Sequence, residues 1–189
     1  MPNWVLRRDA ITPNMTIETN FLNYAAEKLT QLSGRVETCL GKLTADQIWM
    51  RCAENQNAAG NLVLHLSGNV RQWILGGVGG APNTRVRDQE FSARGGIEAE
   101  ALGRLLRETV EGAVTILRSL SPARLGERTT IQGHDVTVLE AIFHVVEHFS
   151  GHTAQIIFIT KMVTGEDLGF YSYLSKPPSQ KESHAGKTA

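Results

Sequence analysis

The sequence predicts an all-α protein, a four-helix bundle with a long connection between its second and third helices and a small β-hairpin before its fourth. Apolar residues recur at intervals of three and four in four long segments. Glycines end the second segment, and a short β-prone stretch precedes the fourth. The chain has 189 residues, which suits one domain, expected over residues 1–175.

The first predicted helix runs from Thr16 to about Leu40, and a short helix follows in the stretch LTADQIWM. In the short helix, Thr44 is expected to be the N-cap and Gln47 to complete a capping box. The spacing places seven residues on the buried face of the first helix, and Lys28 is the single charged one among them. The other six are Ile17, Phe21, Tyr24, Leu32, Val36 and Cys39.

The second predicted helix starts after Asn57 and ends at the glycines of GGVGGAPN. A polar connection of about twenty residues leads to Gly96, a length that favours an overhand crossing to a non-adjacent position in the bundle rather than a simple hairpin of helices. Arg71, Arg85 and Arg87 are interpreted as surface charges, with a grip on an anionic substrate or thiol cofactor as the alternative.

The third predicted helix covers residues 97–120, and the hairpin follows with strands 129–132 and 135–138 around a Gly133–His134 turn. A capping box of Thr137 and Glu140 starts the fourth helix, which runs to about Val163. This helix is apolar nearly all round, which predicts burial on most sides. The polar tail from Lys176 predicts disorder.

Composition excludes several classes of protein. The formal net charge is zero, so the field that attracts a phosphate backbone is missing and nucleic acid is not expected as a partner. The sequence has no apolar run of about 18 residues, so no membrane span is expected. The N-terminal residues show no signal peptide, which predicts a cytoplasmic protein. The two cysteines are expected to be reduced thiols that serve as small apolar side chains.

The stretch HVVEHFSGHTAQI places His144, His148 and His152 on one face of the fourth helix. A buried polar group without a partner costs about 1–3 kcal/mol, so these rings need hydrogen bonds or a metal ion. The spacing His-x3-His is a common helical metal-ligand pattern. His65, on the inner face of the second helix, is the candidate for a third ligand. From the residues alone, hydrogen-bonded histidines and a metal site both remain open.

The pairing of NLVLHLSGN with HVVEHFSGHTAQI resembles the DinB-like (YfiT-like) superfamily of bacterial four-helix bundles. This resemblance implies a metal site formed by His65, His148 and His152. Gln155 stands at the family's glutamine, whereas Ala154 replaces the usual glycine. The resemblance also implies a possible homodimer.

Three further side chains are expected near such a site. His144 is expected to support a ligand or to line the pocket, with an ordinary buried histidine as the alternative. Gln155 and Asn69 are expected to orient a ligand or a histidine nitrogen, with hydrogen bonds between helices as the alternative.

Three neutral imidazoles leave a divalent ion its full charge and an open position, where water has a pKa of ~7 and a thiol loses its proton. Zinc, nickel and iron(II) all suit imidazole. The predicted function is therefore a divalent-metal-binding protein with a site open to a small molecule. The resemblance implies a metal-dependent S-transferase that uses a low-molecular-weight thiol. A metal-dependent hydrolase and a non-catalytic, stress-related binding module stapled by its metal are the alternatives.

Overall fold

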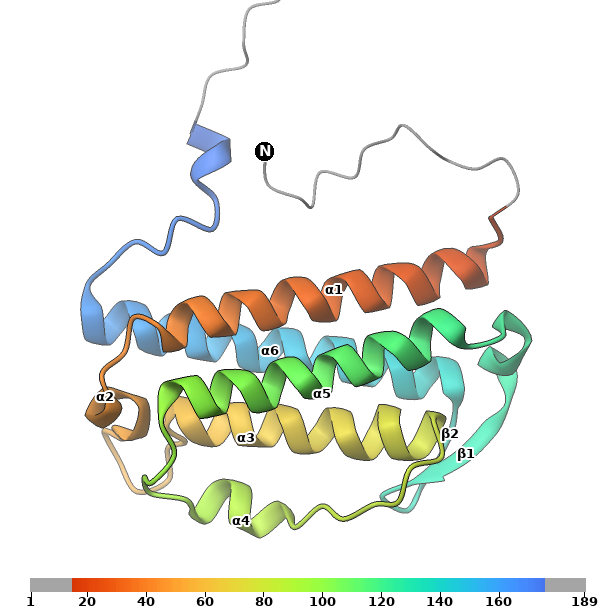
Figure 1. Ribbon diagram of the computed structural model, residues 1–189, viewed down its shortest axis with the longest axis horizontal. Coiled ribbons are helices and arrows are strands. Elements are labelled where there is room, and N and C mark those ends of the chain that lie inside the picture. Colours follow the sequence, from red (N-terminus) through yellow and green to blue (C-terminus); the bar gives the residue numbers. More distant parts are fainter. Residues whose placement is uncertain (1–14, 176–189) are drawn as a thin grey trace, which may run out of the picture.

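The computed structural model describes residues 15–175 and is mostly helical, with a small two-stranded antiparallel sheet (Figure 1). The helical class and the hairpin predicted from the sequence are therefore confirmed. Helix α1 contacts α5 and α6, and helix α3 contacts the same two helices. The long connection therefore joins α3 to a helix that it contacts, so the predicted crossing to a non-adjacent position is wrong. The long helices are α1 (Ile17–Leu40), α3 (Ala59–Val70), α5 (Ala99–Ser119) and α6 (Val138–Thr164), and the short ones are α2 (Ala45–Trp49), α4 (Arg87–Ser92), η2 (Pro122–Gly126) and η3 (Ser172–Ser175).

Helix α1 begins where the hydroxyl of Thr16 accepts a hydrogen bond from the backbone N–H of Thr19, at 3.3 Å. Its predicted apolar face is wrong at the N-terminal end, because Ile17 is 83% exposed and Tyr24 is also exposed. The buried stripe contains two alanines that a search for large apolar residues passes over, and it consists of Leu22, Ala25, Ala26, Leu29, Leu32, Ser33, Val36, Cys39 and Leu40.

The second helix ends within the glycines of GGVGGAPN, as predicted, and Gly76 and Gly77 lie inside its last turns. The helix continues as a π-helix, η1 (Arg71–Val78), and stops at Gly79 and Gly80. A Cβ atom on Gly77 would lie 2.2 Å from Cδ1 of Ile131, a residue of the hairpin. This glycine therefore allows the hairpin to pack closely against η1, which is a different use of glycine from stopping a helix.

The long connection between η1 and α5 is not wholly irregular, as the sequence suggested, because it contains α4. Figure 1 shows α4 lying beside α3, and the two helices are in contact. The buried amide of Asn61 on α3 fixes this arrangement. Its Nδ2 donates to the carbonyl oxygens of Glu90, at 2.8 Å, and Ala93, at 3.0 Å. The connection therefore folds back onto the helix that carries His65.

The hairpin pairs β1 (Arg128–Ile131) with β2 (His134–Thr137). Its turn is formed by Gln132 and Gly133, with φ angles of 54° and 80°, so the predicted Gly133–His134 turn is wrong by one residue. Two residues with positive φ are the signature of a tight turn that matches strand twist. His134 consequently belongs to β2, where it is exposed. The predicted capping boxes at Thr44 and Thr137 are both confirmed.

Helix α6 is less buried than its composition suggested. Phe143 is 60% exposed and Leu139 is also exposed, so one face of the helix is uncovered within residues 15–175. Of the two cysteines, Cys39 is buried as expected, whereas Cys52 is exposed. Across residues 15–175, no helix combines the length and apolar character that crossing a membrane requires. The predictions for the N-terminal residues and for the tail from Lys176 lie outside the described residues.

Candidate metal centre

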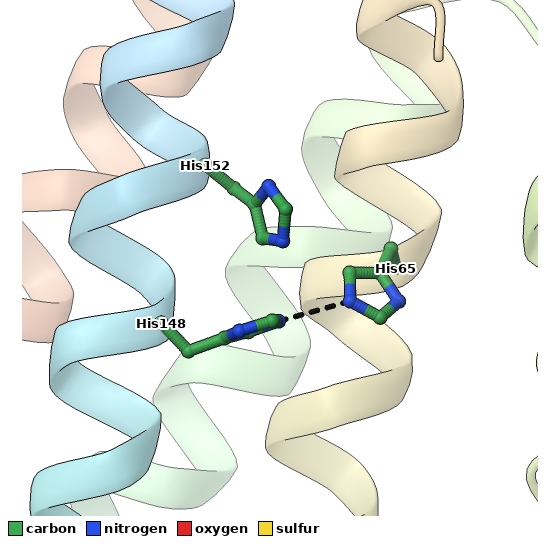
Figure 2. A group of neighbouring side chains, drawn as sticks. All are labelled: His65, His148 and His152. Carbon is green, nitrogen blue, oxygen red and sulfur yellow. Dashed lines mark hydrogen bonds between the residues drawn. The ribbon is translucent and has the colours of Figure 1, made fainter. Parts of the chain in front are cut away.

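Three imidazoles meet in the space between α3 and α6. Figure 2 shows His65 reaching from α3 toward His148 and His152, which lie one turn apart on α6. Nε2 of His65 lies 2.9 Å from Nε2 of His148. One nitrogen from each of the three rings lies within 4.8 Å of the other two, and within the described residues this is the one cluster of its kind. The structure thus brings together the three histidines that the motifs single out.

The orientation of the His65 ring is set by Glu90 of α4. Nδ1 of His65 lies 2.9 Å from Oε2 of Glu90, and both side chains are buried. Nη2 of Arg85 also lies 3.0 Å from this nitrogen, but its hydrogen bonds go to Glu90 as well. An ionised carboxylate only accepts hydrogen bonds, so the contact with Glu90 favours the tautomer of His65 with its proton on Nδ1. Nε2 of His65 then carries the lone pair, which accepts a hydrogen bond from Nε2–H of His148 and is the one that a metal ligand needs.

Arg85 keeps Glu90 ionised in this buried position. Its guanidinium makes two hydrogen bonds to the carboxylate, Nε to Oε1 at 2.6 Å and Nη2 to Oε2 at 2.7 Å. Burial raises the pKa of Glu90, but the hydrogen bonds from Arg85 and His65 and their charges outweigh it, so the pKa lies below its ordinary value. The interpretation of Arg85 as a surface charge is wrong, because its side chain is 5% exposed.

A glycine in α3 makes room for this ion pair. A Cβ atom on Gly68 would lie 1.9 Å from Oε1 of Glu90 and 2.9 Å from Nε of Arg85. No Cβ contact is that short in real proteins, so any larger residue at Gly68 would displace the carboxylate. Gly68 lies one turn after His65 on the same helix, and it therefore controls how closely Glu90 approaches that ring.

Gln155 plays the corresponding part for His152. Nδ1 of His152 lies 2.7 Å from the amide oxygen of Gln155, one turn further along α6. An amide oxygen accepts, so His152 also carries its proton on Nδ1 and leaves the Nε2 lone pair free. Two of the three rings are thus held in the same tautomer by neighbours from this chain.

Burial keeps the rings on α6 neutral. Desolvation lowers the pKa of His148 to about 3, helped by the neighbouring histidines and Arg85. Desolvation also lowers the pKa of His152, although the hydrogen bond to Gln155 acts in the opposite direction. Neutral imidazole is the form that binds metal, so these two rings need no deprotonation at neutral pH.

The remaining predicted residues have different places. His144 lies beside the cluster and outside it, with its ring centroid 4.3 Å from that of Trp73 and 5.5 Å from that of His148. Burial lowers the pKa of His144 as well. Asn69 is buried one turn after His65, and within residues 15–175 no hydrogen bond joins its amide to the three histidines. His144 is thus a neighbour of the site, whereas Asn69 forms no hydrogen bond to its three histidines.

The sequence interpretation missed Glu90 and Asn61 and gave Arg85 a different role, whereas the three side chains together attach the α4 segment to His65. All three roles depend on the connection folding back onto α3, and a polar segment with arginines gives no local indication of that. One signal was available. Gly68 interrupts an apolar helix one turn after a candidate ligand, and a glycine there indicates the close approach of another element.

The donor set is compatible with a divalent ion. In a tetrahedral site with metal–nitrogen bonds of 2.0–2.1 Å, neighbouring ligand nitrogens lie about 3.3 Å apart. The separation of 2.9 Å between His65 and His148 is slightly shorter, and a small rotation of either ring would accommodate an ion. Three neutral imidazoles suit zinc, nickel or iron(II). His148 and His152 are only partly buried, so a small molecule can approach the cluster.

The fold is that of solved DinB-like proteins, and the histidine cluster lies between two of its long helices. The chain belongs to the family described as "Protein of unknown function (DUF1572)", whose model matches residues 16–179. That family lies within the DinB-like superfamily, so the relationship inferred from the histidine motifs is confirmed.

Solved bacterial structures share the fold. A conserved protein from Enterococcus faecalis aligns with a TM-score of 0.63 and 14% identity, covering 76% of this chain and 96% of its own. A DinB-like protein from Bacillus cereus aligns with a TM-score of 0.61 and 17% identity, covering 79% and 93%. A DinB-like protein from Bacillus subtilis, YjoA, aligns with a TM-score of 0.60 and 18% identity, covering 78% and 97%. The search of curated proteins finds no match.

Proposed function

We propose that this protein binds one divalent metal ion through His65, His148 and His152 and keeps a coordination position open to a small molecule. The observation that carries the proposal is the convergence of three ring nitrogens within 4.8 Å of one another. In this proposal the four long helices act as a four-helix bundle, a single domain whose second and fourth long helices hold the ion. Zinc, nickel and iron(II) are the candidate metals.

The residues around the cluster support this function by preparing the ligands. Glu90 and Gln155 accept hydrogen bonds from Nδ1–H of His65 and His152, which leaves the Nε2 lone pair of each ring for a metal ion. Arg85 balances the charge of Glu90, so the carboxylate stays an acceptor in a buried place. A divalent ion bound there would supply Lewis acidity, which lowers the pKa of a water or a thiol that reaches it.

The reaction we propose is transfer of a low-molecular-weight thiol to an electrophile. A sulfur–carbon bond forms, the bond from that carbon to its leaving group breaks, and the leaving group departs with the electron pair. The thiol proton passes to solvent. The partial exposure of His148 and His152 supports this proposal, because both reactants must reach the site. Hydrolysis differs only in that water replaces the thiol as the nucleophile.

A non-catalytic alternative uses the same ligands. His65 and His148 come from different helices, so an ion held by both would staple α3 to α6. Structural zinc sites usually have four protein ligands, whereas the described residues offer a cluster of three. The number of ligands therefore favours an open, reactive site over a staple.

Two measurements on the purified full chain test the proposal. Elemental analysis gives the metal content, and a screen of low-molecular-weight thiols against alkyl halides and epoxides gives the rate of thiol loss. We expect one ion per chain and thiol consumption that stops on chelation. One ion without turnover, together with a large fall in melting temperature on chelation, would support the staple instead. A chain that takes up no zinc, nickel or iron(II) would overturn both.

A further inference from the structure

A second feature lies next to the histidine cluster, a groove between the C-terminal half of α6, the start of α3 and residues 50–57. Its volume is about 840 Å³, within the range of about 300–1,000 Å³ that small-molecule pockets occupy. We call it the α6 groove. Its apolar wall is formed by Met50, Leu62, Phe158, Ile159, Met162 and Val163.

The polar groups of the α6 groove are neutral. Four side-chain amides line it, and no lysine, arginine, aspartate or glutamate is among its lining residues. A charged ligand would lose hydration there without gaining an ion pair, whereas an apolar molecule with neutral hydrogen-bonding groups would lose little. The amides belong to Asn55, Gln56, Asn57 and Gln155.

Gln155 connects the groove to the histidines. Its side chain lines the groove, and its amide oxygen accepts the hydrogen bond from His152. Leu62 of α3 also lines the groove, and it lies one turn before His65. A molecule in the α6 groove would therefore lie beside the candidate metal ligands from both helices.

The groove exposes large apolar side chains that a bound molecule would remove from water. Phe158 is 64% exposed and Met162 is 63% exposed, although both face a concave region. Covering apolar surface contributes roughly 25 cal/mol per Å². A second cavity of about 530 Å³, near α4, is lined by Arg71, Arg85 and Glu90, and its buried ion pair is already formed. The α6 groove is therefore the better candidate for an uncharged ligand.

We propose that the α6 groove binds the apolar, uncharged body of the electrophilic substrate. Its role as a substrate site depends on the function proposed above, whereas its ability to bind an uncharged apolar molecule does not. The groove therefore makes a prediction that needs no bound metal and no turnover.

The test uses N-phenyl-1-naphthylamine, an uncharged probe whose fluorescence rises in apolar surroundings, with the full-length protein. Phe158→Lys places a charge in the groove at an exposed position, where it should not disturb folding. Phe143→Lys is the matched control, because Phe143 is 60% exposed on the same helix and does not line the groove. We expect Phe158→Lys to weaken binding by about tenfold or more and Phe143→Lys to change it by less than about twofold. Equal effects from both variants would overturn the proposal.

Two further readouts locate the probe and define its class. Cys52 lines the groove and is exposed, whereas Cys39 is buried, so N-ethylmaleimide should label Cys52 and saturating probe should slow that labelling. Labelling at an unchanged rate would place the probe elsewhere and contradict the proposal. The sulfonated analogue, 8-anilinonaphthalene-1-sulfonate, should bind more weakly than the uncharged probe. Tighter binding of the sulfonate would overturn the assignment of an uncharged ligand, and metal content measured in parallel shows separately whether the proposed metal function holds.

Discussion

Nδ1 of His65 lies 2.9 Å from Oε2 of Glu90, although the two residues are 25 positions apart and belong to different helices. This contact makes the connection between α3 and α5 a part of the candidate site. A carboxylate that accepts a hydrogen bond from a ligating histidine fixes the ring and raises its basicity, an arrangement common around protein-bound metals. The long connection therefore supplies a residue that orients His65, a role that its polar sequence does not reveal.

Replacing the ligands is the first prediction. His65→Ala, His148→Ala and His152→Ala should each abolish stoichiometric metal binding, because each removes one of three converging nitrogens. His144→Ala should leave most of the metal, since its ring lies outside the cluster and against Trp73. Elemental analysis of the four purified variants gives the answer, with circular dichroism as the check that each is helical. An equal loss of metal from His144→Ala and His148→Ala would show that the ligand pair on α6 has been assigned to the wrong turn.

Glu90→Gln is the second prediction. The substitution removes the ion pair with Arg85 and the charge that holds the His65 proton, so metal affinity should fall by about 10–100-fold. Competition with a chromophoric chelator measures that affinity. Losing one partner of a buried ion pair also destabilises the fold, by about 3–5 kcal/mol, so the titration belongs well below the melting temperature of the variant.

Asp88→Asn provides the control for Glu90→Gln. Asp88 lies on the same short helix as Glu90, and its replacement by asparagine also removes one negative charge. Asp88 is exposed, however, and forms no ion pair with Arg85. Its metal affinity should match that of the wild type. If both variants bound metal equally well, the His65–Glu90 contact would have no influence on the ligand.

Much of the fold was predictable because its signals are local. The capping boxes at Thr44 and Thr137 lie within a few residues of the helix starts they define, and the histidine motifs identify the superfamily directly. Glu90 was not predictable in the same way. Its position depends on the hydrogen bonds from Asn61 and on the space above Gly68, which are contacts between segments far apart in the sequence.

The exposed face of α6 shows a second limit of sequence patterns. Periodicity reveals which residues share a face of a helix, but it does not reveal whether another element covers that face. Leu139 and Phe143 are apolar and exposed, so the apolar character of α6 overstated its burial. The hairpin turn differs from its prediction by one residue because Gln132, which has no special preference for positive φ, takes the first turn position.

The third prediction concerns pH and the metal-free protein. The pKa of His148 is 6.5 in its unperturbed state and about 3 in the fold, so between these values the unfolded chain binds more protons. The free energy of unfolding should therefore be highest above pH 6.5 and should fall as the pH decreases toward 3. Urea unfolding between pH 7 and about pH 4.5 samples this window before most carboxylates titrate.

His148→Gln tests the source of that pH dependence. The variant should show a shallower decline over the same range, because the most strongly shifted group that takes up a proton on unfolding is gone, whereas His144 and His152 remain. His134→Gln, on the exposed strand β2, should keep the wild-type slope. Identical slopes in all three proteins would mean that His148 is not held neutral by burial.

The fourth prediction contrasts two glycines in the middle of helices. Alanine favours a helix over glycine by about 1 kcal/mol, so Gly34→Ala on α1, where a new Cβ would meet nothing within 4 Å, should stabilise the protein by up to that amount. Gly68→Ala should do the reverse, because its Cβ would lie 1.9 Å from Oε1 of Glu90 and would force the carboxylate away from His65. We expect a lower melting temperature and weaker metal binding for Gly68→Ala, measured by thermal unfolding and chelator competition. If Gly68→Ala were as stable as Gly34→Ala and bound metal as tightly, the Glu90 carboxylate could move away from His65 without weakening metal binding. The role assigned here to the α4 connection would then be wrong.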